Sequence, residues 1–232
     1  MIEIRSVNVG RVGVLLRWSG GEVLSGIDKR PVDVPSLALS TTKLAGDEQQ
    51  DHRPTVPGDQ VHGGPHKAVY ALPREHLARI GEIVGAPVGP GFMGENVTIA
   101  GALEHDVCIG DVWAWGSARL QVASPRGPCY KLGIKIGRQA ARTLIREERL
   151  TGWYLRVLQT GEVPTSGSIS VTARHPAGVT VADVLGALYD RPRVHPELVL
   201  DDVMPPGLRA ALVDPDRDIT GGVPETDGPD QI

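Results

Sequence analysis

The stretch ARLQVASPRGPC, residues 118–129, decides how this chain is built, because a strand pattern ends there abruptly in a stiff loop. Ala118, Leu120 and Val122 recur at every second position, which is the period of a half-buried strand. The two prolines of SPRGPC fix the backbone and cannot continue a hydrogen-bonded ladder. We therefore expect a strand whose end presents the thiol of Cys129.

The charges around Cys129 make this thiol a candidate functional group. Arg126 precedes it by three residues and Lys131 follows it by two. Neighbouring cations favour the thiolate and so lower the pKa of a cysteine. The alternative is a half-buried cysteine that merely follows a turn, since a free cysteine often behaves as a small hydrophobe.

Outward from this stretch, the chain reads mainly as short strands joined by turns. The 29 glycines and 19 prolines predict many turns. Residues 1–19 are expected to form strands that pair as a hairpin with the next segment of the chain, and further strand patterns lie at 97–99 and 107–113. We expect the apolar strand at 153–158 to have 168–171 as its neighbour.

Helical spacing is confined to a few segments. Pro73 is expected at the first position of a helix that runs to Gly85, and a second helix is expected over residues 138–150. From Thr180, a predicted N-cap, a further helix begins, and two short helical pieces are expected at 194–201 and 205–214.

These patterns predict an α+β, β-rich chain in three parts. Residues 1–175 would form the main domain, residues 176–217 a small C-terminal helical region, and residues 218–232 a disordered tail. The tail sequence, DITGGVPETDGPDQI, is polar and rich in turn residues.

Composition excludes several classes of function. The formal net charge is −4 with both signs mixed, and no basic stripe with interleaved aromatic residues suggests a nucleic-acid partner. No apolar run is long enough to span a membrane, and the N-terminus does not fit a signal peptide. Two cysteines cannot form a disulfide framework, so we expect a reduced, cytoplasmic setting.

The motif HGGPHK, residues 62–67, is the second candidate site, and it closes a loop-like segment at 45–66. Adjacent glycines allow backbone N–H groups to converge on an anion, and Lys67 adds a positive charge. A zinc site built on His62 and His66 is a distant alternative, because the intervening Gly-Gly-Pro cannot be helical. A plain tight turn with exposed polar residues is the other.

Three further residues carry weaker signals. Cys108 lies between Val107 and Ile109 and is expected to be a core cysteine within a strand. Lys29, in Asp-Lys-Arg, fits either a solvated surface or an anion site. Asn96 fits either a ligand contact or a turn cap.

The order of motifs resembles one family. SGIDKRPV, DQVHGGPHKAVYALPREH, GFMGENVTIAG, CIGDVW and LQVASPRGPCYKL resemble the MOSC domain, specifically its bacterial YiiM-like branch, over roughly residues 24–172. TGWYLRVLQTGEV and the helices after it look like the small three-helix region that accompanies this branch.

The resemblance implies a fold and a set of site residues. The fold would be a mixed β-barrel with flanking helices plus the small C-terminal helical unit. The cofactor would be the molybdenum cofactor, Mo-molybdopterin, with Cys129 as the metal ligand and the residue on which catalysis depends. The pterin and its phosphate would be held by basic, glycine-rich and polar positions, which match Lys29, His62, Gly63, Gly64, Lys67, Asn96 and Arg126.

The resemblance implies three possible functions, in order of preference. The first is reduction of a small N-hydroxylated compound at the molybdenum, with electrons from a partner protein, because no iron–sulfur or flavin motif is present. The second is a sulfur carrier with a persulfide on Cys129, and the third is a cofactor-binding module without turnover. Neither a nucleic acid nor a membrane is expected as a partner, and a homodimer is left open.

Overall fold

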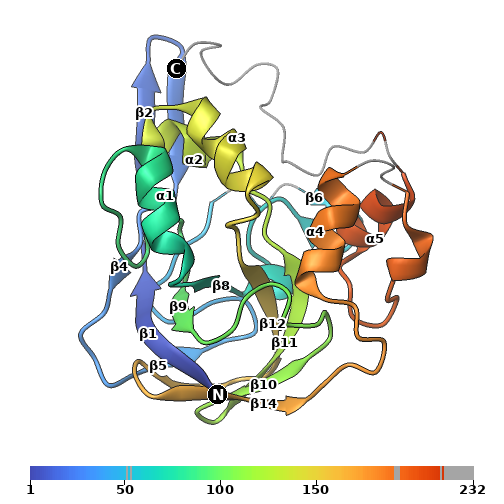
Figure 1. Cartoon of the computed structure of the whole chain (residues 1–232). Coiled ribbons are helices and arrows are strands. Elements are labelled where there is room, and N and C mark those ends of the chain that lie inside the picture. Colours follow the sequence, from blue (N-terminus) through green and yellow to red (C-terminus); the bar gives the residue numbers. More distant parts are fainter. Residues whose placement is uncertain (51, 53, 191–193, 215, 217–232) are drawn as a thin grey trace.

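A closed barrel of seven strands forms the body of the protein in a computed structural model that describes residues 1–50, 52, 54–190, 194–214 and 216 (Figure 1). The barrel strands are β1 (Ile2–Val9), β8 (Val69–Pro73), β9 (Val97–Ala100), β10 (Val112–Trp115), β11 (Ala118–Pro125), β12 (Trp153–Gln159) and β14 (Ser168–Ala173). Their order is β14-β10-β11-β12-β8-β9-β1, and pairing of β1 with β14 closes the ring. Only β8 and β9 run parallel among these pairs, so the barrel is mixed, as expected.

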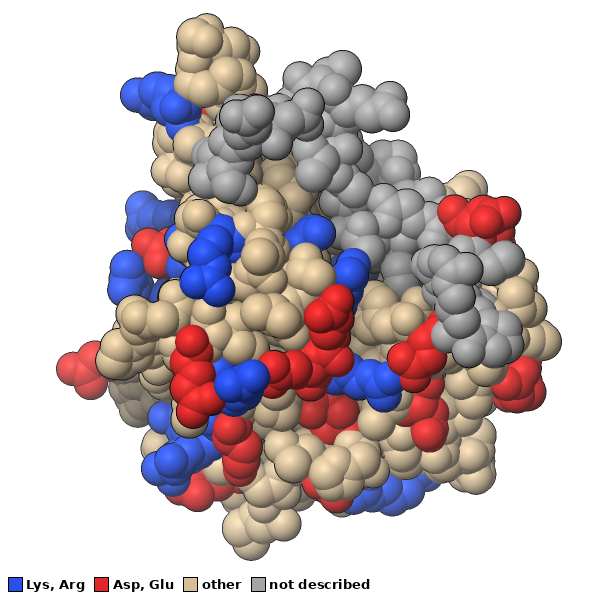
Figure 2. All heavy atoms as spheres, turned by 45° about the horizontal axis from the view of Figure 1, so that its top comes forward, with Lys and Arg blue, Asp and Glu red and all other residues tan. Residues whose placement is uncertain are grey.

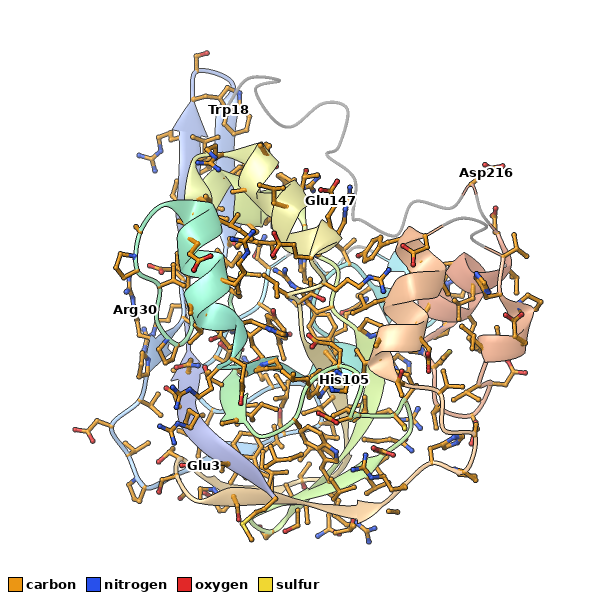
Figure 3. All side chains as sticks on the ribbon, viewed as in Figure 1. Glu3, Trp18, Arg30, His105, Glu147 and Asp216 are labelled. Carbon is orange, nitrogen blue, oxygen red and sulfur yellow. The ribbon has the colours of Figure 1, made fainter. Side chains whose placement is uncertain are left out.

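Shorter strands pair with one another outside the barrel sheet or extend its edge. They are β2 (Gly13–Trp18) with β3 (Gly21–Ser25), β5 (Ser36–Leu39) with β13 (Gly161–Pro164), β6 (Pro54–Val56) with β7 (Asp59–Gln60), and β4 (Arg30–Pro31) on the edge of β1. The β2–β3 hairpin projects from the body, and Trp18 lies near its tip (Figure 3).

The helices lie outside the barrel in two groups (Figure 1). They are α1 (His76–Val84), α2 (Tyr130–Ile136), α3 (Gln139–Glu147), α4 (Val181–Tyr189) and α5 (Pro206–Val213), with short 3-10 turns η1 (Pro65–Lys67) and η2 (Pro196–Leu198). Helices α1, α2 and α3 bury Ile80, Leu132 and Ile145 in one apolar cluster with Leu72 of β8. Helices α4 and α5 pack on the main core instead.

The barrel interior is filled by side chains (Figure 3). Although only 4% of the residues are aromatic, Trp113, Trp115 and Trp153 are fully buried. The rings of Trp113 and Trp153 meet edge to face with centroids 5.9 Å apart, a favoured aromatic geometry. The interior is therefore a packed core, and ligands must bind at its rim.

The structure confirms some local predictions. Thr180 caps α4 through a capping box in which the Asp183 N–H donates to Thr180 Oγ1 at 3.0 Å and the Thr180 N–H donates to Asp183 Oδ2 at 2.9 Å. Gly85 ends α1 in the left-handed conformation. Of the two C-terminal pieces, one is α5 and the other shrinks to η2.

Two local predictions are wrong. Pro73 is the last residue of β8, paired with Ile99, and α1 begins only at His76. Strand β14 pairs with β10 and β1, whereas β12 lies between β11 and β8. Residues 130–136, for which no element was predicted, form α2, which contacts α3 and ends in a left-handed cap at Gly137.

The division into a domain at 1–175 and a helical region at 176–217 stays a prediction, and the tail at 218–232 lies outside the described residues. Among those described, no helix has the length and apolar character needed to cross a bilayer. Basic and acidic side chains are interspersed on the face shown in Figure 2, without a broad area of one sign.

Candidate functional site

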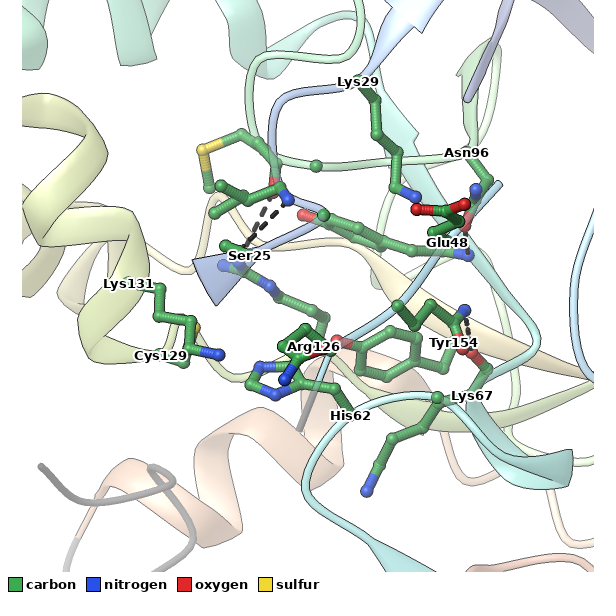
Figure 4. Close-up of a pocket in the computed structure, with 18 of the residues that line it drawn as sticks. Ser25, Lys29, Glu48, His62, Lys67, Asn96, Arg126, Cys129, Lys131 and Tyr154 are labelled. Atoms are coloured by element: carbon green, nitrogen blue, oxygen red, sulfur yellow. Dashed lines mark hydrogen bonds between the residues drawn. The ribbon is translucent and has the colours of Figure 1, made fainter. Parts of the chain in front are cut away.

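A cleft opens at the rim of the barrel, where five loops meet (Figure 4). The loops are the one that follows β3, the one that follows β5, the one that precedes η1, the one that joins α1 to β9 and the one that joins β11 to α2. Of the eight predicted site residues, the described lining includes seven, namely Lys29, His62, Gly63, Lys67, Asn96, Arg126 and Cys129. Gly64 is outside this lining.

Cys129 lies at the end of the loop that follows β11 and is the N-cap of α2. Burial alone raises the pKa of its thiol. A hydrogen bond with the His62 side chain, the charges of His62 and Arg126, and the Lys131 backbone N–H outweigh burial and lower the pKa to about 6. Of the two cations expected from sequence, Arg126 lowers the pKa through its charge and Lys131 through its backbone N–H. His62, which lies 67 positions earlier in the chain, adds a further contribution.

Arg126 is 4% exposed and forms the floor of the cleft beside Cys129. Its guanidinium lies 5.2 Å from the centre of the Tyr70 ring, and Nη2 donates to the Met93 carbonyl at 3.4 Å. The other terminal nitrogen, Nη1, is buried without a hydrogen-bond partner among the described residues. A buried donor of this kind is costly unless a ligand or water completes it.

Lys29 and Asn96 share one buried carboxylate, Asp47. The Lys29 ammonium pairs with Asp47 Oδ1, and the Asn96 amide nitrogen donates to Asp47 Oδ2 at 3.0 Å. Lys29 is 6% exposed, so it is no solvated surface residue, although its neighbour Arg30 is exposed. Burial lowers the pKa of Lys29, and Asp47 opposes that shift.

The Asn96 amide is fully engaged by the protein. Its oxygen accepts from the Tyr70 backbone N–H at 3.1 Å, and its nitrogen also reaches the Asn8 carbonyl at 3.4 Å. Asn96 thus links β8, β9 and β1 through hydrogen bonds. Of its two predicted roles, the structure favours the structural cap over a ligand contact.

The HGGPHK turn brings His62, Gly63 and Lys67 to the cleft. Lys67 is held by the protein, because its Nζ pairs with Asp59 at 3.0 Å and also donates to the Gln60 carbonyl. Gly63 has a φ of 68°, a left-handed conformation that favours glycine.

A zinc site is not formed by this turn. His62 lines the cleft with Cys129, whereas His66 lines a different cleft. Within the described part of the chain, no three His, Cys, Asp or Glu side chains gather in a way that could hold a metal ion. A molybdenum cofactor poses a different requirement, because it brings its own sulfur ligands and needs one thiolate from the protein.

Sequence reasoning missed several site residues. Lys131, 5% exposed, extends toward Cys129 and His62, and only its place two residues after Cys129 hinted at this (Figure 4). Glu95 is fully buried and accepts from the backbone N–H groups of Gly91 at 2.6 Å and Met93 at 3.0 Å, which fixes the loop behind Arg126. Burial raises the pKa of Glu95. No local pattern marks such a residue.

Cys108 is not a strand cysteine of the core. It is half-buried and forms only an isolated bridge to Thr180 beside α4. Burial raises the pKa of its thiol, and the negative charge of Asp111 raises it further. The surroundings of Cys108 thus raise the pKa of its thiol, whereas those of Cys129 lower it.

Comparisons with known proteins identify relatives of this chain. The family model of the MOSC domain matches residues 58–171. The uncharacterized protein YflK of Bacillus subtilis is 35% identical over 179 residues, 77% of this chain and 77% of that protein. The protein YiiM of Escherichia coli is 33% identical over 172 residues, 72% of each chain.

Two further matches extend the comparison. The crystal structure of YiiM from Geobacillus stearothermophilus superposes with a TM-score of 0.72 at 27% identity and covers 91% of this chain and 97% of that one. A protein of Gibberella moniliformis named reductase is 33% identical over 162 residues, 67% of this chain but 27% of that longer protein.

Proposed function

The chain belongs to the MOSC family, in its YiiM-like branch, and on that premise we propose that its cleft holds a molybdenum cofactor through Cys129 and reduces N-hydroxylated small molecules. One observation carries the proposal. Cys129 is buried where five loops meet, yet its pKa is lowered to about 6. A thiolate is therefore present at neutral pH, and it is a soft ligand suited to molybdenum.

The other cleft residues suit an anionic pterin. Four cationic side chains, Lys29, Lys67, Arg126 and Lys131, line the cleft, and Glu48 is the one acid among its described lining residues. Lys29 and Lys67 are paired with Asp47 and Asp59, so a ligand anion would depend mainly on Arg126 and Lys131. Two buried nitrogen atoms, Arg126 Nη1 and His62 Nδ1, have no hydrogen-bond partner among the described residues. Both are therefore available to hydrogen-bond a ligand.

Roles can be assigned to this chain's own residues. Cys129 would bind the metal, and Arg126 and Lys131 would bind the pterin or its phosphate. Lys29, which is paired with Asp47, would contribute to the electrostatic field at the edge of the cleft. When bound, the cofactor supplies the two-electron redox chemistry. Asn96 and Gly63 would shape the site rather than contact the reacting atoms.

The proposed reaction is R–NHOH + 2e⁻ + 2H⁺ → R–NH₂ + H₂O. The N–O bond breaks, the substrate nitrogen is reduced, and the oxygen leaves as water. His62 and Lys131, both beside Cys129, are placed to hold the protons (Figure 4). The electrons would come from a partner protein, and the reductase name of the Gibberella relative supports the reaction class.

The test is turnover of cofactor-loaded protein with a reduced artificial electron donor. A hydroxylamine and an N-hydroxylated base are offered as substrates, and the amine product is quantified by chromatography. We expect wild type and Cys108→Ala to form product and Cys129→Ala to lose at least about a hundredfold in rate, as expected when the metal ligand is removed. Loaded wild type that reduces neither substrate would contradict the proposal.

A sulfur carrier is the second candidate, and the same low pKa of Cys129 favours it. A thiolate can attack the outer sulfur of a donor persulfide, so that the S–S bond of the donor breaks, the donor leaves as its thiol and Cys129 holds the persulfide. This function predicts an additional sulfur atom on Cys129 in the intact-protein mass, removed by a thiol reductant and absent in Cys129→Ser. If the protein binds molybdenum but shows neither turnover nor a persulfide, it functions as a cofactor-binding module.

A further inference from the structure

Glu104 is a buried carboxylate that none of the functions above uses. It lies in the loop that joins β9 to β10, is 7% exposed, and does not belong to the described lining of the Cys129 cleft. Its backbone carbonyl accepts from the Ala182 N–H of α4 at 3.0 Å, which holds the loop in place. Because a buried charge is costly unless it is paired and hydrogen-bonded, the partners of this carboxylate indicate what it does.

The Glu104 carboxylate binds two partners from different parts of the chain. Its Oε1 accepts from the Gly152 backbone N–H at 2.8 Å. Nε2 of His76, the first residue of α1, lies 3.0 Å from Oε1 and 2.9 Å from Oε2. The His76 side chain is only 11% exposed, so the pair is largely shielded from water. Glu104 thus connects the start of α1 to the segment that precedes β12.

That segment, residues 151–152, supports Arg126 in two ways. The Arg126 backbone N–H donates to the Gly152 carbonyl at 3.0 Å. The Tyr70 hydroxyl donates to the Thr151 carbonyl at 2.7 Å, and the Arg126 guanidinium lies over the Tyr70 ring. A displacement of the segment would therefore move both the backbone and the aromatic ring that hold Arg126.

Arg126 is the group through which the segment reaches the thiol. It lies beside Cys129 and His62 in Figure 4. Burial raises the pKa of the Cys129 thiol, and the contacts of His62 and the charge of Arg126 lower it to about 6. Since the energy between two charges depends on their separation, a shift of the guanidinium changes the stability of the thiolate.

We propose that Glu104 is a positioning residue, which keeps Arg126 beside Cys129 by holding the segment at residues 151–152. It acts through its acceptor oxygen from outside the cleft, and His76 stabilises its buried carboxylate. The inference rests on the proposed function for the use that the site makes of Arg126. Its test needs neither molybdenum nor turnover, so either idea can fail while the other holds.

Two substitutions separate position from charge. Glu104→Gln keeps the side-chain length and an acceptor oxygen for the Gly152 N–H but removes the charge, whereas Glu104→Asp keeps the charge and is one methylene shorter. We expect Glu104→Asp to raise the pH midpoint of Cys129 alkylation by at least about half a unit, which below the midpoint is about a threefold fall in rate. Glu104→Gln should stay close to the wild-type midpoint.

A purely electrostatic role of Glu104 predicts the reverse pattern. Removal of a negative charge favours a nearby thiolate, so Glu104→Gln would lower the midpoint and Glu104→Asp would leave it unchanged. Asp106→Asn is the matched control, because Asp106 is a carboxylate of the same loop with a 51% exposed side chain. It should leave the midpoint unchanged. If Glu104→Asp does not fold, Glu104→Gln decides alone, since its midpoint equals that of wild type only if the charge is dispensable.

The route through Arg126 is tested in a second background. In Arg126→Gln, the further substitution Glu104→Asp should shift the midpoint by less than about half of its effect alone, because the group that it positions is gone. An equal shift in both backgrounds would overturn the proposal. So would a lowered midpoint in Glu104→Gln or an unchanged midpoint in folded Glu104→Asp.

Discussion

The two cysteines of this chain lie in regions with opposite electrostatics. Cys129 is the more buried thiol, yet its pKa is lowered to about 6, because His62, Arg126 and a backbone N–H stabilise its thiolate. Cys108 is more exposed, yet burial and the charge of Asp111 raise its pKa. Arg174 pairs with Asp111 at 2.6 Å, so the cation nearest Cys108 is largely neutralised. The difference shows that placement of charges, rather than exposure, determines which thiol is reactive.

The largest expected effect is a separation of the two thiols in their pH profiles. A thiolate forms as pH rises through the pKa, so alkylation of Cys129 should reach half its maximal rate near pH 6. Cys108 should titrate above the ordinary value of about 8.5. Peptide mass spectrometry after timed iodoacetamide pulses measures both in one sample, and midpoints that coincide would refute the comparison.

His62→Ala should reduce the difference between the pKa values of the two thiols. Without its hydrogen bond and charge, burial raises the pKa of Cys129, and the rate of alkylation at pH 6.5 should fall by about tenfold or more. The exposed His105→Ala is the matched control and should leave the Cys129 midpoint unchanged. A His62→Ala profile identical to wild type would show that the histidine does not hold the thiolate.

A further effect is expected in folding stability. The folded pKa of Cys129, about 6, lies below its unfolded value of about 8.5, so the thiolate favours the folded state. This contribution, about 3 kcal/mol, is fully present above pH about 8.5 and is lost as pH falls through about 6. Urea unfolding of wild type and Cys129→Ser at pH 5.5 and 9 measures it, and equal pH slopes for the two proteins would contradict it.

The sequence predicts the parts of the site that are local. The strand that ends in SPRGPC, the thiol after it and the Gly-Gly turn each have a short-range pattern, and the structure brings all three to one cleft. The prediction of a barrel came from the resemblance to a family. The alternation of apolar residues identifies single strands but does not show that β1 pairs with β14 to close the sheet.

The parts that escaped prediction depend on contacts between distant residues. Asp47 gathers Lys29 and Asn96, which are 18 and 49 positions away, and no periodic pattern encodes such a pairing. Glu95 holds the loop at Gly91 and Met93 through backbone N–H groups, and no sequence pattern encodes such contacts. Helix α2 has only seven residues, which is too short for a helical period to stand out in the sequence.

Molybdenum and pterin content tests the central claim most directly. Wild type, Cys129→Ala and the matched Cys108→Ala are produced in cells that make the cofactor, and metal is measured by elemental analysis and pterin by fluorescence. The account predicts close to one molybdenum per chain in wild type and Cys108→Ala and almost none in Cys129→Ala. Absence of molybdenum from all three proteins, or equal molybdenum in all three, would contradict it.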